Sequence, residues 1–168
     1  NLVSGPHITD STGALSVSNL TAGTVYVKEL GHTDANVATL YTCVSANPQK
    51  ATITAGATAT VNFHNRLNTG GVKLVKETNT GKNLDGWQIG LYTDATCTKP
   101  VSGSPFTTGA DGSVTVSDLS VGTLYAKEIE VDDPYWVCDT SVKTVNITAG
   151  QTATVTFRNT HYGDLRIR

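Results

Sequence analysis

Three residues of different chemistry stand at the ends of strand-like stretches whose other inward-facing residues are apolar. They are Lys76, Glu128 and Asn159. Alternate residues of a β-strand point to the same face, so an amine, a carboxyl group and a carboxamide each fall on a face that should be buried. A buried polar group needs a partner. If the first and last of these strands are neighbours, the three groups can meet in an apolar setting.

This trio has the chemistry to form an isopeptide bond. Burial lowers the pKa of a lysine and raises that of a carboxylic acid, so a neutral Lys76 amine can attack the side-chain carbonyl carbon of Asn159. We expect Glu128 to hydrogen-bond the Asn159 carbonyl as a neutral acid and to move protons. Ammonia leaves, and the cross-link forms once, without cofactor or metal. The alternative is that all three groups are solvated strand ends. Lys73, the competing amine, faces outward by alternation.

The chain repeats itself with a unit of roughly 95 residues. The matched positions are 13–20 with 112–119, Glu29 with Glu128, Cys43 with Cys138, and Asn65 with Asn159. Glu29 and Asn65 therefore recur, but the chain has no lysine at the position matching Lys76, so we expect a bond in one unit only. Asn68 is a rival to Asn65, and the phenylalanine that precedes each matched asparagine by two positions favours Asn65.

The repeat predicts the domain organisation. We expect a partial repeat over 1–66 that lacks its first strands, a short linker over 67–70 and a complete repeat over 71–160. Residues 161–168 are expected to be the first strand of a further repeat or a strand that completes the partial unit. The simplest interpretation is a window of a tandem array, packed end to end across a short linker. The open sheet edge of the partial unit also permits strand exchange with another copy.

The complete repeat is predicted to be all-β. Its expected strands lie near 71–77, 87–93, 113–117, 123–129, 135–139, 143–148 and 152–159. Thr- and Val-rich stretches separated by Gly, Asn and Asp favour strands and turns, and about seven short strands in one unit indicate an Ig-like or prealbumin-like β-sandwich. No segment has a convincing helical period.

Composition excludes several classes of function. The net charge is −2 with 15% charged residues, and no basic stripe of the kind that binds nucleic acid is present. No apolar run is long enough to insert into a membrane. The four histidines are scattered, so neither a Ser/His/Asp arrangement nor the paired Cys/His spacing of a zinc site occurs. An ordinary hydrolase therefore has no support in the sequence.

The three cysteines leave at least one without an internal partner. Cys97 and Cys138 are expected to form a disulfide within the complete repeat, and the alternative is two buried free thiols. Cys43 matches Cys138 but has no counterpart of Cys97 to pair with. A disulfide would imply an oxidising, extracellular setting.

Taken in order, these stretches resemble the Cna protein B-type domains, which are the prealbumin-like domains of Gram-positive surface proteins and pilins. Residues 72–76 resemble the lysine strand of that family, 84–92 its second strand, 125–128 its glutamate strand, and 155–160 its terminal strand with the acyl partner. The turn at 132–135 departs from the Pro-x-Gly-Tyr turn common in such domains, which affects a loop and none of the three reactive residues.

The resemblance implies a structural role. We expect a stalk domain of an adhesin or pilus-like protein on the bacterial cell surface, cross-linked from Lys76 to Asn159 with Glu128 as the proton shuttle. Its partners would be neighbouring repeats, with a host ligand bound through other domains. The alternative is a module that binds carbohydrate or a host protein through Trp87, Tyr135 or Trp136. Neither reading makes the protein an enzyme with turnover.

Overall fold

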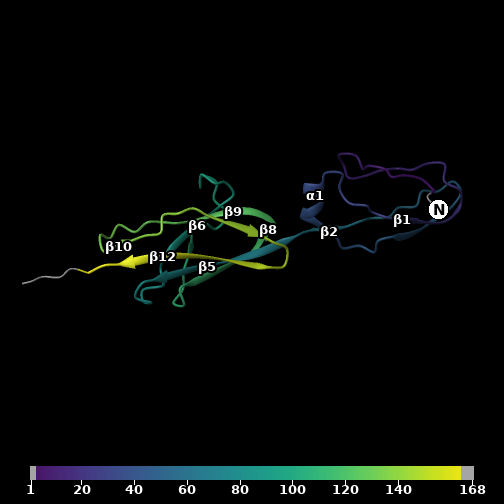
Figure 1. The fold of residues 1–168 in the computed structure, drawn as a ribbon. Coiled ribbons are helices and arrows are strands. Elements are labelled where there is room, and N and C mark those ends of the chain that lie inside the picture. The colour runs from purple at the N-terminus through teal and green to yellow at the C-terminus, as the bar shows by residue number, and fades with distance from the viewer. Residues whose placement is uncertain (1–2, 164–168) are drawn as a thin grey trace, which may run out of the picture. The chain divides into compact units, whose positions relative to one another are not determined.

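The structure is a computed structural model in which residues 3–163 are described, and most of its regular structure is β (Figure 1). The chain divides into two compact units. The first comprises the described residues up to His32 together with Cys43–Asn65, and the second comprises Thr33–Thr42 and the described residues from Arg66 onward. Of the predicted segment 161–168, residues 164–168 lie outside the described part.

The first unit is built on one antiparallel pair, β1 (Gly23–Val27) with β3 (Gln49–Ile53). A separate two-stranded sheet, most of whose residues are assigned to the second unit, pairs β2 (Tyr41–Cys43) with β4 (Asn65–Leu67). None of the buried apolar side chains of the described chain lies before Val72. The first unit therefore has strands but no closed core.

One short helix, α1 (Ala35–Leu40), was not expected from the sequence. The Asp34 side chain caps it by accepting a hydrogen bond from the backbone N–H of Asn36 (2.8 Å). None of its six residues is buried. A helix that buries no face has no apolar period to detect, which is why the sequence showed no helical period at this position.

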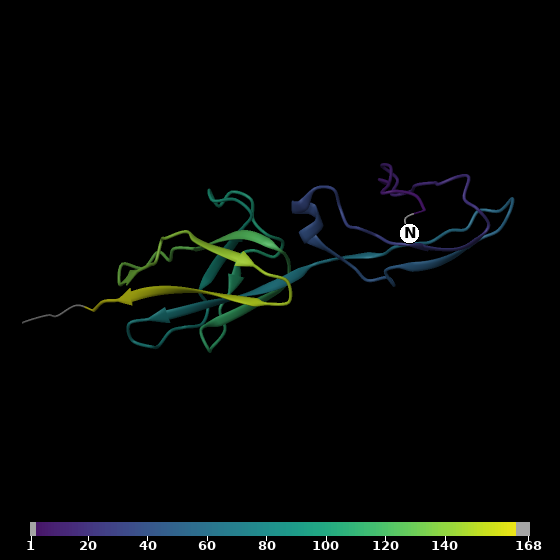
Figure 2. The same cartoon turned by 45° about the vertical axis from the view of Figure 1, so that its right-hand side comes forward.

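The second unit contains two four-stranded sheets. Its strands are β5 (Thr69–Thr78), β6 (Gln88–Tyr92), β7 (Phe106–Thr107), β8 (Ser113–Ser120), β9 (Gly122–Glu128), β10 (Trp136–Val137), β11 (Lys143–Ile147) and β12 (Thr152–His161). One sheet has the order β10-β12-β5-β8 and the other the order β11-β9-β6-β7. In both views β5 and β12 run side by side (Figures 1 and 2), and they are parallel, whereas the other pairs are antiparallel. The prediction that the chain folds mainly into β-sheets is confirmed, with α1 as the exception among the described residues.

The core lies between these two sheets, and strand alternation decides which residues enter it. Val72 and Leu74 of β5, Ala126 of β9 and Phe157 of β12 are fully buried, while Lys73 is exposed as predicted. Burying a valine, leucine or phenylalanine side chain contributes about 1.5–3 kcal/mol. The same alternation carries three polar residues into the core, one from each of β5, β9 and β12.

Candidate functional site

Lys76 and Asn159 come from the two parallel strands at the centre of one sheet. In the register of β5 with β12, Lys76 lies opposite Phe157, and Asn159 lies opposite Thr78. Asn159 is two residues beyond Phe157, so it points to the same face as Phe157 and lies diagonally across from Lys76. The first and last strands of the unit, β5 and β12, are therefore neighbours, as the proposed meeting of the three groups requires.

Glu128 reaches these two groups from the opposite sheet, where it lies across from Ile89 of β6. The Nζ of Lys76 donates to Oε2 of Glu128 (2.5 Å), and the Nδ2 of Asn159 donates to Oε1 (2.5 Å). The exposed fractions are 1% for Lys76, 1% for Glu128 and 2% for Asn159. One carboxylate thus holds the amine and the carboxamide together, away from water.

Burial changes the acidity of the amine. Removal from water lowers the pKa of Lys76 from its ordinary value, and the hydrogen bond and charge of Glu128 oppose this shift without cancelling it. The indole of Trp87, which is itself buried, covers the amine with its ring centroid 4.0 Å from Nζ. A lowered pKa favours the neutral amine, which is the nucleophilic form.

The carbonyl oxygen of Asn159 has a partner that the sequence analysis missed. Its Oδ1 accepts a hydrogen bond from the backbone N–H of Asp139 (2.8 Å), whereas Glu128 contacts the amide nitrogen. The expectation that Glu128 would bond the carbonyl is corrected accordingly. A backbone donor stabilises negative charge that develops on an oxygen during acyl transfer. A main-chain N–H has no signature in the sequence, and only the loop after β10 brings it to this position.

The three cysteines are free thiols, so the expected disulfide between Cys97 and Cys138 is not formed. Burial raises the pKa of the Cys97 and Cys138 thiols. The positive charge of Lys127 opposes this rise at Cys97, and the negative charge of Glu128 adds to it at Cys138. Lys127 and Glu128 are successive residues of β9 and point to opposite faces. The two thiols are therefore influenced by charges on opposite faces of this strand. Cys43, expected to be unpaired, is also free.

The first unit brings together the two matching residues that the repeat identified. The Nδ2 of Asn65 donates to Oε1 of Glu29 (2.7 Å). Asn68, the rival candidate, instead donates to the carbonyl oxygens of Thr39 and Leu40 and accepts from the Thr42 hydroxyl. Asn65 is therefore the asparagine that contacts the glutamate in this unit.

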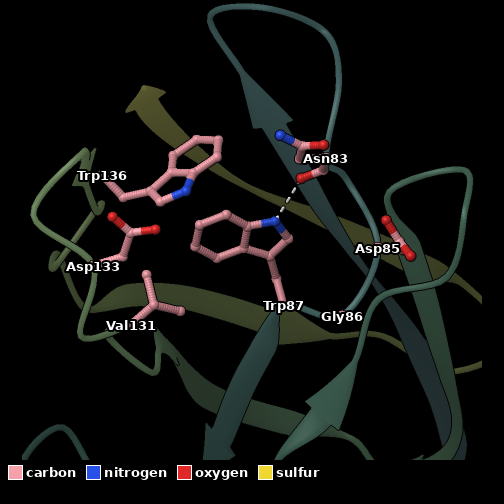
Figure 3. A pocket seen from close by; sticks show the side chains of 7 residues that line it. All are labelled: Asn83, Asp85, Gly86, Trp87, Val131, Asp133 and Trp136. Atoms are coloured by element: carbon pink, nitrogen blue, oxygen red, sulfur yellow. Dashed lines mark hydrogen bonds between the residues drawn. The ribbon is translucent and has the colours of Figure 1, made fainter. Parts of the chain in front are cut away.

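A shallow pocket of about 280 Å³ lies beside Trp87 (Figure 3). It is lined by Asn83, Asp85, Gly86, Trp87, Val131, Asp133 and Trp136. The rings of Trp87 and Trp136 meet edge to face, with centroids 5.0 Å apart. Within residues 3–163 no group of three or more His, Cys, Asp and Glu side chains is arranged to hold a metal ion.

The second unit matches one family of domains. The chain belongs to the SpaA prealbumin-like fold domain family, whose match covers residues 70–161, and this confirms the expected relationship to prealbumin-like domains. No curated protein has a sequence that matches the chain. Over the described residues, no helix has the length and apolar character needed to cross a membrane.

Several solved structures of Gram-positive proteins are similar to the chain. BcpA, the major pilin subunit of Bacillus cereus, is 19% identical with a TM-score of 0.46 over 54% of this chain and 28% of its own. GBS52, the minor pilin of Streptococcus agalactiae, is 17% identical with a TM-score of 0.49 over 88% of this chain and 87% of its own. The Bacillus anthracis TIE protein is 20% identical with a TM-score of 0.45 over 67% of this chain, and the match spans only 23% of its own length.

Proposed function

We propose that the second unit is a structural domain of a Gram-positive surface or pilus-like protein, and that an isopeptide bond between Lys76 and Asn159 cross-links it. One observation carries this proposal. The amine and the carboxamide are hydrogen-bonded to the two oxygens of a single buried carboxylate, that of Glu128. Reacting groups held side by side and out of water gain the rate advantage of an intramolecular reaction.

The reaction balances without any added reagent. A proton passes from Nζ of Lys76 to Oε2 of Glu128, which leaves a neutral amine and a neutral acid. The Nζ lone pair attacks Cγ of Asn159, and the N–H of Asp139 stabilises the charge on Oδ1. Glu128 then delivers its proton to Nδ2, the Cγ–Nδ2 bond breaks, and ammonia is released. The excess proton on Nζ passes to the Glu128 carboxylate and from there to the departing ammonia, which leaves as ammonium. The product is one amide bond, and Glu128 ends as the carboxylate that it was at the start.

The cross-link explains what such a domain would be for. It closes a loop of about 83 residues, and by analogy with a disulfide such a closure stabilises the fold by about 4–5 kcal/mol. Because the bond joins the first strand of the unit to its last, tension applied along the chain passes through a covalent link. This suits a stalk of tandem repeats, packed end to end with their neighbours on the outside of the cell, that carries other domains away from the surface.

The test is the intact mass of the full chain under denaturing and reducing conditions. We expect a mass lower than the sequence mass by one ammonia, and a branched peptide joining β5 to β12 after proteolysis. Glu128→Ala and Lys76→Arg should each restore the full mass. Lys73→Arg is the matched control, because Lys73 is on the same strand but exposed, and it should leave the ammonia loss unchanged. A wild-type chain of unmodified mass would refute the proposal.

A second candidate function is carbohydrate binding at the pocket beside Trp87. The observation that favours it is the combination of two indole rings with the carboxylates of Asp85 and Asp133 (Figure 3), since aromatic faces and hydrogen-bonding acids are suited to sugars. Titration calorimetry with oligosaccharides, repeated on Trp136→Ala, tests this reading. No heat of binding from any sugar would exclude it.

A further inference from the structure

The backbone N–H that donates to the reactive carboxamide belongs to the loop between β10 and β11. We propose that the carboxylate of Asp139 and the ammonium of Lys143 form a clamp that positions this N–H, that of Asp139, on Oδ1 of Asn159. Both side chains act on the reacting atoms through the N–H, so they are positioning residues. The inference rests on the proposed function of the second unit, and it adds two residues to the reactive trio.

The N–H points at the atom on which charge develops during the cross-linking reaction. Oδ1 of Asn159 becomes negative when the amine attacks, and the backbone nitrogen of Asp139 lies 2.8 Å from it. Such a donor accelerates a reaction because it is held in place beforehand and does not have to reorganise. Residues 138–142 belong to no helix or strand. Some contact other than a regular sheet must therefore hold this N–H in place.

The side chain of Asp139 holds its own loop. Its Oδ1 accepts hydrogen bonds from the backbone N–H (3.2 Å) and the hydroxyl (2.5 Å) of Ser141, which closes a local turn. Its Oδ2 accepts from Nζ of Lys143 at 2.9 Å. Burial raises the pKa of Asp139, but the hydrogen bonds from Ser141 and Lys143 outweigh this effect and lower the pKa to about 2. The carboxylate is therefore ionised near neutral pH.

Lys143 connects this turn to the core. It is the first residue of β11 and lies on the same face as Val145 and Ile147, which are buried. Its Nζ lies 5.1 Å from the ring centroid of Phe157, which has no exposed surface. A cation at the edge of an apolar face needs a partner, and Asp139 is that partner.

One ammonium group thus contacts both halves of the hydrogen bond that the reaction uses. Phe157 precedes Asn159 by two residues on β12 and shares its face, so Lys143 contacts the strand that carries the carboxamide. It also contacts the loop that carries the N–H. Because a partly exposed ion pair contributes little to stability, the main effect of this pair should be on the reaction.

The first repeat has the matching asparagine but not the clamp. Val44 stands where the second repeat has Asp139, and no ion pair can form there. Gln49 stands where the second repeat has Lys143, at the start of the matching strand. The N–H of Val44 donates to the backbone carbonyl of His64 (2.8 Å). The loop N–H is thus bonded to the carboxamide in the repeat that has the acid and the lysine, which agrees with the proposed positioning role.

The first measurement is the rate at which the full chain loses ammonia. Chains are made by cell-free synthesis, synthesis is stopped, and samples are quenched in denaturant at intervals for intact mass. We expect Lys143→Met and Asp139→Asn each to slow the loss at least about tenfold, because a displaced donor forfeits part of the roughly 100- to 1,000-fold that such a donor contributes. Arg158→Met is the matched control. It also removes an ion pair, with Glu77, but an exposed one, and should leave the rate unchanged.

The second measurement follows the N–H itself in a chain that cannot cross-link. In a Lys76→Met background, the amide proton of Asp139 should move upfield and exchange faster with solvent when Lys143→Met is added, as measured by ¹⁵N-edited NMR. Arg158→Met in the same background should change neither property. A purely structural role of the ion pair would alter the melting temperature without a selective change at this amide.

The outcomes separate this inference from the proposed function. If the wild-type chain loses ammonia and the folded variants of Asp139 and Lys143 lose it equally fast, the clamp is refuted while the proposed function stands. Slowing without a change at the Asp139 amide also refutes the clamp. A wild-type chain of unmodified mass refutes both. If either variant does not fold, Ser141→Ala, which removes only a hydroxyl donor to the carboxylate, should still slow the loss, and an unchanged rate would overturn the inference.

Discussion

The indole ring of Trp87 lies over the amine of Lys76, with 4.0 Å between the ring centroid and Nζ. Trp87 is held there by a hydrogen bond from its ring N–H to the carbonyl of Asn83 (2.7 Å) and by edge-to-face contact with Trp136. The same ring lines the pocket of Figure 3. Trp87 thus contacts Lys76 directly, and we expect it to position the amine and to keep water from it.

Replacing Trp87 by alanine should slow the cross-link. Water would reach Nζ, and the pKa of Lys76 would return toward its ordinary value, so less of the amine would be neutral. We expect a mixture of cross-linked and unmodified chains by intact mass, and a further loss of about 3–5 kcal/mol of stability from the truncated core. Trp136→Ala is the matched control, since Trp136 contacts Trp87 but not the amine; equal slowing in both variants would contradict a direct role for Trp87.

The lowered pKa of Lys76 predicts how stability depends on pH in a chain that cannot cross-link. In Asn159→Ala the amine stays free, and it binds more protons in the unfolded state, where its pKa is ordinary at about 10.5, than in the folded state. The free energy of unfolding should therefore rise with pH between the lowered folded pKa and the ordinary unfolded pKa. In the other direction, this contribution to stability is lost as the pH falls through the folded pKa. Urea titrations across this range measure the slope.

Lys76→Met in the same Asn159→Ala background is the control for that experiment. The substitution removes the titrating group while keeping an apolar side chain of similar length. The pH slope above neutrality should disappear in the double variant. A slope that persists unchanged would assign the effect to another group.

The cross-link should be most visible under force. When the second unit is pulled between residues near its first and last strands, the wild-type chain should extend only by the segments outside the bond. Asn159→Ala should extend by the full loop of about 83 residues. Single-molecule force spectroscopy reads this difference in contour length directly, and full extension of a chain whose mass shows the ammonia loss would refute the placement of the bond.

The thiols should behave as three separate free cysteines. Denatured, non-reduced chain should take up three equivalents of a maleimide, and reductant should leave the melting temperature unchanged. In the folded state alkylation should be slow at neutral pH, because interaction with Glu29 and burial raise the pKa of Cys43, and burial raises those of Cys97 and Cys138. Uptake of a single label by the denatured chain would mean that two of the cysteines are paired.

Local alternation was sufficient to identify much of the site. Because side chains alternate along a strand, the sequence alone placed Lys76, Glu128 and Asn159 on the inward faces of their strands, and Lys73 on the outward face of its own. The repeat identified Glu29 and Asn65 as a matching pair, because each unit carries its own copy of the pattern.

Tertiary structure decided everything that depends on contacts between distant segments. Only the parallel pairing of β5 with β12 sets Lys76 beside Asn159, and only the packing of the opposite sheet sets Glu128 between them. The Asp139 N–H, the Trp87 ring over the amine and the absence of a Cys97–Cys138 disulfide have no local signature. Alternation is a property of each strand by itself, whereas the neighbours of a strand are chosen by the whole core.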